Sequence, residues 1–304
     1  MKITKAVVPV AGIGTRLLPT TKALPKEMLP LGRLPIIHRV VEELIKAGIS
    51  EILFVTNRSK GIIENHFDDY SELLMHLEKA KDPRLEYSRF NYADEGIQFF
   101  SVRQPIVQGC SKPSGTGGAV LAAEKFVNNH PFVVAFGDSV IYSPQNPTLL
   151  ERLIKSHEKN LSECTIASYE VAPELVDQYG VLEIKSGEHQ IEDCQVTSII
   201  EKPNPEQTNS RLVISARYVF SPTIFAQIRR TNPTETGEIY LTDAISGLIQ
   251  NNHRVRTVKL NVVEKRYDIG NHLAYFKSFI DYALTDNECR EELVRYLKQI
   301  IAYE

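Results

Sequence analysis

The feature that most constrains the fold lies near the N-terminus, where a short apolar run ends in a glycine-rich turn. Ala6–Val10 is continuously apolar and leads into Gly12-Ile13-Gly14-Thr15-Arg16. Such a run is typical of a buried strand, and the glycine loop after it exposes backbone N–H groups at the edge of a sheet. Arg16 and, one loop later, Lys26 add two cations at the same place. The combination predicts a binding site for a nucleoside triphosphate.

A helix and a second strand follow this loop. Pro35 opens a stretch whose apolar residues recur at helical spacing, and Gly48 is a natural end for that helix. Glu51–Thr56 then has the composition of a strand. Strand, helix and strand in this order form a right-handed βαβ unit, so we expect parallel strands in this part of the chain.

The later part of the chain has a more antiparallel character. Tyr179–Ile184 and Gln195–Glu201 flank a Ser-Gly turn and predict a β-hairpin. A helix is expected over Thr242–Gln250, with the Thr242 hydroxyl as its N-cap, and two more helices are expected at the C-terminal end. Because no repeat, low-complexity tract or linker divides the chain, one compact α/β domain with a C-terminal helical extension is the simplest organisation.

Composition narrows the function classes. The 304 residues are 42% hydrophobic with a formal net charge of -3, which favours neither a nucleic-acid binder nor a polybasic membrane protein. No stretch approaches the ~20 apolar residues that span a bilayer, and the N-terminal apolar run is too short for a signal peptide. No CxxC pair occurs, so we expect a cytoplasmic protein with reduced thiols at Cys110, Cys164, Cys194 and Cys289.

Three kinds of phosphate-binding loop compete for Gly12–Arg16. A dinucleotide-binding fingerprint needs a third glycine where Leu17 stands, and a P-loop needs a Gly-Lys-Ser/Thr sequence that does not follow. The loop G-x-G-T-R, with Pro-Lys a few residues later, is typical of sugar nucleotidyltransferases. Gly12–Arg16 and Pro25-Lys26 match it as written. A glycine-rich turn that binds no ligand is the remaining alternative.

Two aspartates at strand ends suggest a metal site. Asp138 follows the apolar strand expected over Phe132–Phe136, at the rim where open α/β sheets bind ligands. Asp268 precedes a glycine turn between a short strand and a helix. Either carboxylate could cap a helix instead. Together they fit a Mg²⁺ site better, because hard cations take carboxylate and phosphate oxygens together.

Three further stretches carry side chains suited to a sugar phosphate and a base. Lys202 can neutralise a phosphate, and the neighbouring Glu201 can accept hydrogen bonds from sugar hydroxyls. Gly180 would allow a flat sugar ring to approach the backbone. The Gln104 amide has both a donor and an acceptor, which suits one edge of a pyrimidine. A solvated strand end before Pro203 is the alternative for Glu201 and Lys202.

Taken together, these stretches resemble the sugar nucleotidyltransferase family, and its uridylyltransferase branch in particular. The matching blocks are spread over nearly the whole chain. The first is specific to the wider class, and KEMLPL with EIYLTDAI narrows the likeness to the uridylyltransferases. The blocks are AGIGTRLLPTTKALPKEMLPL (11–31), ENHFD (64–68), VRQ (102–104), EKP (201–203), ARYVFS (216–221), GEIYLTDAI (237–245) and YDIGN (267–271).

The resemblance implies a fold and a reaction. The fold would be a three-layer, Rossmann-like α/β nucleotidyltransferase fold with a mixed, mainly parallel central sheet, an antiparallel sugar-binding part and C-terminal helices. Within a single domain, 1–304, residues 1–140 would mainly bind nucleotide, 141–270 would mainly bind sugar, and 271–304 would form the C-terminal helices. The reaction would be Mg²⁺-dependent nucleotidyl transfer from UTP to glucose 1-phosphate, giving UDP-glucose and pyrophosphate.

The resemblance also implies roles for individual residues. Arg16 and Lys26 would be the catalytic cations, and Asp138 and Asp268 would hold Mg²⁺. The sugar phosphate would bind to Gly180, Glu201 and Lys202. The nucleotide would bind to Ala11, Gly12, Gly14, Glu27, Gln104 and either Gly117 or Gly118.

Some segments depart from the family pattern. Gly115–Ala119 lacks a histidine usual at this point, and Ser215-Ala216 stands where a glycine usually precedes Arg-Tyr-Val. These changes affect the base and sugar pockets, so dTTP or another sugar 1-phosphate is an alternative substrate. A non-catalytic sugar-nucleotide sensor is the alternative from another functional class. The apolar C-terminal helices could form a homodimer or homotetramer interface, or pack on their own domain.

Overall fold

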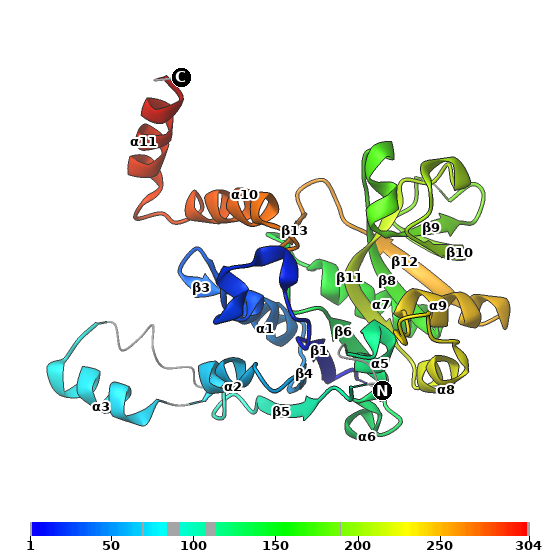
Figure 1. Ribbon diagram of the computed structural model, residues 1–304, viewed down its shortest axis with the longest axis horizontal. Coiled ribbons are helices and arrows are strands. Elements are labelled where there is room, and N and C mark those ends of the chain that lie inside the picture. Colours follow the sequence, from blue (N-terminus) through cyan, green and yellow to red (C-terminus); the bar gives the residue numbers. More distant parts are fainter. Residues whose placement is uncertain (1, 69, 84–91, 107–112, 189, 303–304) are drawn as a thin grey trace.

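The computed structural model describes residues 2–68, 70–83, 92–106, 113–188 and 190–302, so Cys110 lies outside the described residues. Within them, nine strands form one central sheet in the order β5-β4-β1-β6-β11-β8-β12-β10-β9, with helices on both faces (Figure 1). This is the predicted three-layer α/β architecture. The strands are β1 (Lys5–Pro9), β4 (Glu51–Thr56), β5 (Gln98–Arg103), β6 (Phe132–Ala135), β8 (Cys164–Glu170), β9 (Gly180–Ile184), β10 (Asp193–Glu201), β11 (Leu212–Phe220) and β12 (Val255–Lys259).

The N-terminal half of the sheet is parallel, as the βαβ pattern predicts. β1 lies between β4 and β6 and runs parallel to both, with Val8 opposite Phe54. These strands are buried on both faces, which explains why their sequences are continuously apolar rather than alternating. β11 runs antiparallel to β6 and β8, and β9 and β10 form the predicted antiparallel hairpin. The sheet is therefore mixed.

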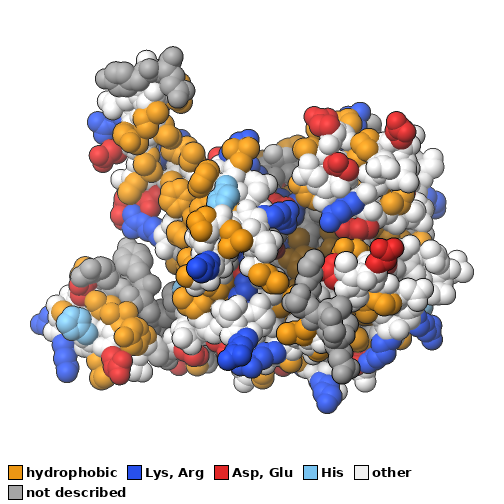
Figure 2. Space-filling model, viewed as in Figure 1, with side chains coloured by type: hydrophobic (Ala, Val, Ile, Leu, Met, Phe, Trp, Pro, Cys, Tyr) orange, Lys and Arg blue, Asp and Glu red, His pale blue; other side chains and the backbone are white. Residues whose placement is uncertain are grey.

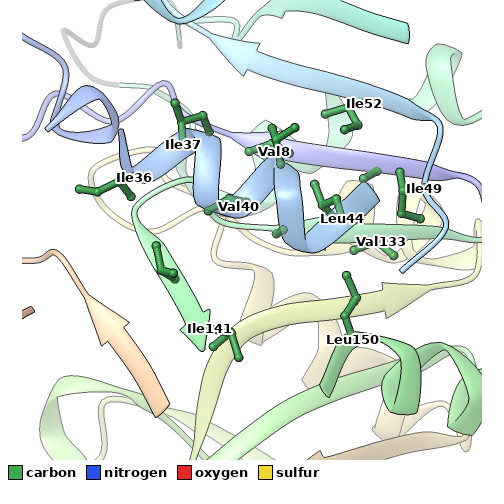
Figure 3. Packing of buried hydrophobic residues seen from close by; sticks show 14 of the residues in the cluster. Val8, Ile36, Ile37, Val40, Leu44, Ile49, Ile52, Val133, Ile141 and Leu150 are labelled. Atoms are coloured by element: carbon green, nitrogen blue, oxygen red, sulfur yellow. The ribbon is translucent and has the colours of Figure 1, made fainter. Parts of the chain in front are cut away.

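The two large hydrophobic cores of the described residues lie on the two faces of the sheet. On one face, Ile37, Val40 and Leu44 of α1 pack with Val8 and Val133 of the sheet (Figure 3). The other core is formed with α5, α8 and α9. Regular helical spacing of apolar residues is what allows each helix to bury one stripe. The helices are α1 (Ile36–Lys46), α2 (Gly61–Phe67), α3 (Ser71–Ala80), α5 (Gly115–Leu121), α6 (Glu124–Val127), α7 (Leu149–Asn160), α8 (Thr223–Arg230) and α9 (Leu241–Gln250).

Smaller elements complete the fold. β7 (Ser139–Tyr142) pairs with β13 (Lys265–Asp268), and β2 (Pro30–Leu31) pairs with β3 (Leu34–Pro35). The chain ends in two helices, α10 (His272–Ala283) and α11 (Arg290–Ala302). None of the residues of α11 is buried, and this helix extends away from the rest of the protein (Figure 1). In the described part of the chain, no helix has the length and apolar character needed to cross a membrane.

The expectation that Thr242 caps its helix is wrong. α9 begins at Leu241, so Thr242 lies inside the first turn, and its hydroxyl is buried without a hydrogen-bond partner among the described residues. The backbone N–H of Leu241 donates instead to the hydroxyl of Thr116 at 3.0 Å. A free N–H group at the helix start is thus satisfied by a distant part of the chain.

His157 makes the stability of this fold sensitive to acid. It is buried on α7, with Nδ1 3.1 Å from the hydroxyl of Thr165 on β8. Burial lowers the pKa of His157 from 6.5 to about 4, and Glu163 opposes this shift only in part. Between these two pH values the unfolded chain takes up a proton that the folded chain does not. Stability therefore falls as the pH falls.

We expect His157→Gln to flatten the pH dependence of stability. In the unsubstituted protein, His157 should account for a loss of about 3 kcal/mol in the free energy of unfolding on acidification to pH 4. Urea titrations at several pH values measure this loss, with His253→Gln, an exposed position, as the control. An unchanged slope in H157Q would contradict the role given to this histidine.

Candidate active site

The glycine loop after β1 lines a cavity at the edge of the sheet. Residues 11–15 form one wall of this cavity, whose volume is about 400 Å³. The Asn57 side chain donates to the carbonyl of Ala11 at 2.6 Å, and the Thr21 hydroxyl donates to that of Gly14 at 2.7 Å. Gly14 has a φ of 74°, a conformation that favours glycine. The predicted phosphate loop is therefore held in place through its carbonyl groups.

Lys26 and Asp138 meet in this cavity as an ion pair. Lys26 begins a short 3₁₀ helix, and Asp138 lies in the turn between β6 and β7. Burial alone would lower the pKa of Lys26, but Asp138 and Glu27 outweigh burial and raise it. Burial also opposes ionisation of Asp138, but Lys26 holds the pKa of this carboxyl below its usual value. Both groups are therefore charged at neutral pH.

Glu27, which is expected at the base, forms a buried ion pair with Lys60 at 2.6 Å. Both side chains are almost fully buried, although Glu27 also contributes to the cavity wall. Burial raises the pKa of Glu27, and Lys60 and Lys26 oppose the rise. Sequence analysis missed Lys60, because nothing in its local sequence marks a partner 33 positions away.

Gln104 lines the same cavity from the residue after β5. Its side-chain nitrogen donates to the carbonyl of Gly115 at 2.8 Å and to the hydroxyl of Ser114 at 3.3 Å. Its backbone N–H donates to the carbonyl of Thr56 at 2.8 Å. The amide is thus fixed at the wall where the resemblance places the base.

Gly117 and Gly118, expected to face the base, are closely packed against neighbouring residues and do not line the described cavity. Gly115 does line it. A Cβ on Gly117 would come 2.8 Å from the side chain of Ile239, and one on Gly118 would come 2.0 Å from the hydroxyl of Ser114. Both positions therefore require glycine for a packing reason. Gly115, which lines the cavity, has a φ of 79°, a conformation that favours glycine.

A second cavity, of about 620 Å³, contains the residues expected to bind the sugar phosphate. Gly180, Glu201 and Lys202 all line it, and Gly180 lies opposite Glu201 on the hairpin of β9 and β10. A Cβ on Gly180 would come 2.7 Å from the side chain of Ile214. This part of the wall therefore has no room for a larger residue.

The two cavities adjoin one another. Thr116, Phe136 and Tyr240 line both of them. Arg16 lines the second cavity, and Arg16 and Lys26 together line a small recess. The two predicted catalytic cations therefore lie where a ligand in one cavity would approach a ligand in the other.

Asp138 and Asp268 lie at neighbouring ends of paired strands. Asp268 lies opposite Ser139 in the pair of β13 and β7, and the N–H of Ile269 donates to the Asp138 carbonyl at 3.1 Å. Asp138 lines the first cavity and Asp268 the second. No group of three or more His, Cys, Asp or Glu that could hold a metal ion occurs among the described residues. Two carboxylates nevertheless suit Mg²⁺, which usually keeps water and substrate phosphates as further ligands.

Arg266 is a cation of the site that sequence analysis missed. Its guanidinium is almost buried in the wall of the second cavity and donates to Asp268 at 3.1 Å and to the Tyr169 hydroxyl at 2.6 Å. It also lies over the rings of Tyr169 and Tyr179. Burial would lower the pKa of Arg266, but Asp268 and both tyrosines outweigh burial and raise it. The spacing of Arg266 and Asp268 two residues apart on one strand is the signal that could have found it.

The chain resembles known proteins along nearly its whole length. The nucleotidyl transferase family matches residues 5–284. UTP–glucose-1-phosphate uridylyltransferase 2 of Streptococcus pyogenes serotype M3 is 38% identical over 302 residues, which are 98% of this chain and 96% of that protein. UTP-bound UGPase from Acinetobacter baumannii has a TM-score of 0.85 at 34% identity and 99% coverage of both chains. A UDP-glucose pyrophosphorylase complexed with UDP-glucose has a TM-score of 0.78 at 32% identity, covering 92% of this chain and 98% of that one.

We expect Lys60→Met to destabilise the protein strongly, because Glu27 would stay buried without its ion pair to Lys60. The free energy of unfolding should fall by about 3–5 kcal/mol, measured by urea denaturation. Lys22→Met is the control, since Lys22 is exposed, and should change stability by no more than about 0.5 kcal/mol. If K60M behaves like K22M, the pair does not carry the stability assigned to it.

Proposed function

The chain belongs to the nucleotidyl transferase family, among the UTP–glucose-1-phosphate uridylyltransferases, and we propose that it transfers a uridylyl group from UTP to glucose 1-phosphate. The products are UDP-glucose and pyrophosphate. The observation that carries the proposal is the pair of adjoining cavities. Arg16 and Lys26 line a small recess beside them. The names of the relatives and the UTP and UDP-glucose complexes of similar proteins support these substrates.

The nucleotide occupies the first cavity. Ala11, Gly12 and Gly14 offer the loop backbone to its phosphates, as glycine-rich turns commonly do. Gln104 and Glu27 line the wall assigned to the uracil, and Gly115 lines the same cavity. Glucose 1-phosphate occupies the second cavity, with its phosphate near Lys202 and its hydroxyls within reach of Glu201.

The reaction needs no general base. A phosphate oxygen of glucose 1-phosphate is already an anion, so it attacks the α-phosphorus of UTP and the bond to pyrophosphate breaks. Two unit charges ~4 Å apart repel by about 4 kcal/mol at an effective dielectric of ~20. Arg16, Lys26 and Lys202 offset this repulsion and hold the two substrates in line. Positioning and charge neutralisation therefore account for the catalysis.

Mg²⁺ belongs to this proposal as the cofactor. Asp138 and Asp268 would hold it, since their strands are paired and their carboxylates are hard oxygen donors. When bound, the ion supplies additional positive charge for the phosphate oxygens. In the free protein the same carboxylates are paired with Lys26 and Arg266. We also propose a cytoplasmic location, where nucleoside triphosphates are available.

An assay of pyrophosphate release from UTP and glucose 1-phosphate tests the function. Asp138→Asn and Asp268→Asn should each lower kcat by about 100-fold or more, because each removes a carboxylate that would hold Mg²⁺, whose positive charge offsets the repulsion between the phosphates. Asp94→Asn, at an exposed position, is the matched control. Chelation of divalent cations should abolish turnover. Activity near normal in either aspartate variant would remove that residue from the metal site.

A substrate panel in the same assay separates the alternatives. A higher kcat/KM with dTTP than with UTP, or with another sugar 1-phosphate than with glucose 1-phosphate, would identify a related transferase with other substrates. Tight binding of UDP-glucose without any turnover would identify a sensor. Retention of Arg16, Lys26, Asp138 and Asp268 in one site favours the enzyme.

We also propose that a second copy of the chain covers the C-terminal helices in a homodimer or homotetramer. Hydrophobic side chains gather on this extension (Figure 2), and Leu273, Phe276, Phe279 and Ile280 of α10 are all exposed. Exposed apolar side chains gathered on one face in this way favour association with another protein surface, here a second copy of the chain.

Light scattering after gel filtration tests the assembly. Phe276→Asp should reduce the mass to that of the monomer, because it places a charge in the apolar contact. Lys277→Asp, at the exposed neighbouring position, should leave the mass unchanged. A monomeric unsubstituted protein would exclude the assembly.

A further inference from the structure

Arg217 of β11 is fully buried and is not part of the described wall of either cavity. Its Nε and Nη2 donate to the two carboxylate oxygens of Glu43 on α1, at 2.9 and 2.7 Å. This two-pronged geometry is strong and directional, because the planar guanidinium matches the carboxylate. The orientation of the guanidinium is therefore fixed by α1.

The remaining donors of Arg217 hold the turn that carries Asp138. Nη2 donates to the Ser139 carbonyl at 2.7 Å, and Nη1 contacts the Phe136 carbonyl at 3.4 Å. These two carbonyls lie on either side of Gly137-Asp138. One rigid group thus binds both ends of the turn and restricts where the Asp138 side chain can lie.

The turn is also closely packed. A Cβ on Gly137 would come 2.5 Å from the side chain of Val10 and 3.1 Å from that of Ile37. The N–H of Gly137 donates to the carbonyl of Pro9 at 3.3 Å. Packing against β1 and α1 and the contacts from Arg217 therefore act on the same short segment.

β11 has an irregular shape at the residue before Arg217. Its register with β8 shifts between Ile214 and Tyr218, and Ala216 within this shift has a φ of 53°. The Ala216 carbonyl accepts from the N–H of Phe136 at 3.2 Å and from Nη1 of Arg217 at 3.1 Å. Such bulges often occur beside active sites, where they direct a side chain.

We propose that Arg217 is a positioning residue for the reaction, which fixes the carboxylate of Asp138 through the carbonyls of Phe136 and Ser139. Its catalytic consequence rests on the proposed function. A purely structural Arg217 would affect stability alone. If Arg217 positions Asp138, its loss also makes the turn at residues 136–139 less ordered and lowers the turnover number.

Paired substitutions separate these two roles. Removing Arg217 alone would leave the Glu43 carboxylate, whose side chain is 9% exposed, without its ion pair, so R217M/E43M replaces both charges with apolar side chains of similar volume. The matched control is R256M/D193M, which removes an ion pair of 2.6 Å between β12 and β10. R217K keeps the charge but loses the planar fork.

Two readouts apply, and one of them needs no activity. Hydrogen exchange by mass spectrometry reports the order of residues 136–139, and we expect exchange there to be about tenfold faster in R217M/E43M. In steady-state assays its kcat should fall about 10- to 100-fold, while KM for UTP changes by less than about threefold. The control should change neither quantity, and R217K should lie between it and the double variant.

Equal exchange in the turn and equal kcat in R217M/E43M and the control would overturn the inference. If the double variant does not fold, R217K decides the question by the same two readouts, with exchange at the level of the control as the negative result. Faster exchange in the turn of a protein that has no uridylyltransferase activity would support the positioning of Asp138 and overturn the proposed function.

Discussion

Pairing of opposite charges at the edge of the sheet is the constraint on which the site depends. Lys26 pairs with Asp138, and Glu27 pairs with Lys60. Glu27 and Lys60 are buried, and a buried charge without a partner costs several kcal/mol, on the order of 3–5, so these two groups need each other before any substrate arrives. The charged side chains are consequently held in place in the free protein. Under the proposed function, the phosphates of the nucleotide replace Asp138 as the partner of Lys26.

The second cavity follows the same rule. Arg266 pairs with Asp268 and lies over the rings of Tyr169 and Tyr179. Both aspartates proposed as Mg²⁺ ligands are thus balanced by a cation of the protein itself. Substrates and a divalent cation would exchange partners within an existing balance instead of entering an uncompensated acidic site. Under the proposed function, a Mg²⁺ ion held by both aspartates would link the charges of the two cavities.

Local sequence patterns predicted the N-terminal βαβ unit and the position of Asp138 at the end of a strand. The apolar run before Gly12 and the helix that ends near Gly48 form the expected βαβ unit, and strand ends placed Asp138 at a cavity because such ends converge at one rim of the sheet. Contacts between distant segments could not be predicted in this way. The partner that satisfies the start of α9 is Thr116, which lies 125 positions before Leu241. Lys60 is another such case, because only the folded chain brings it to Glu27.

Ala216, which stands where the family usually has glycine, has a backbone conformation that affects more than the sugar pocket. Its φ of 53° lies in the left-handed region, which costs a non-glycine residue roughly 1–2 kcal/mol. The conformation persists because the Ala216 carbonyl is bound by the N–H of Phe136 and by Arg217. Glycine would relieve the strain, but it would also allow the bulge more conformations. Alanine therefore limits the freedom of the segment that presents Arg217. Alanine in place of glycine at position 216, a change that sequence analysis connected only with the substrate pockets, therefore also affects the position of the turn that carries Asp138.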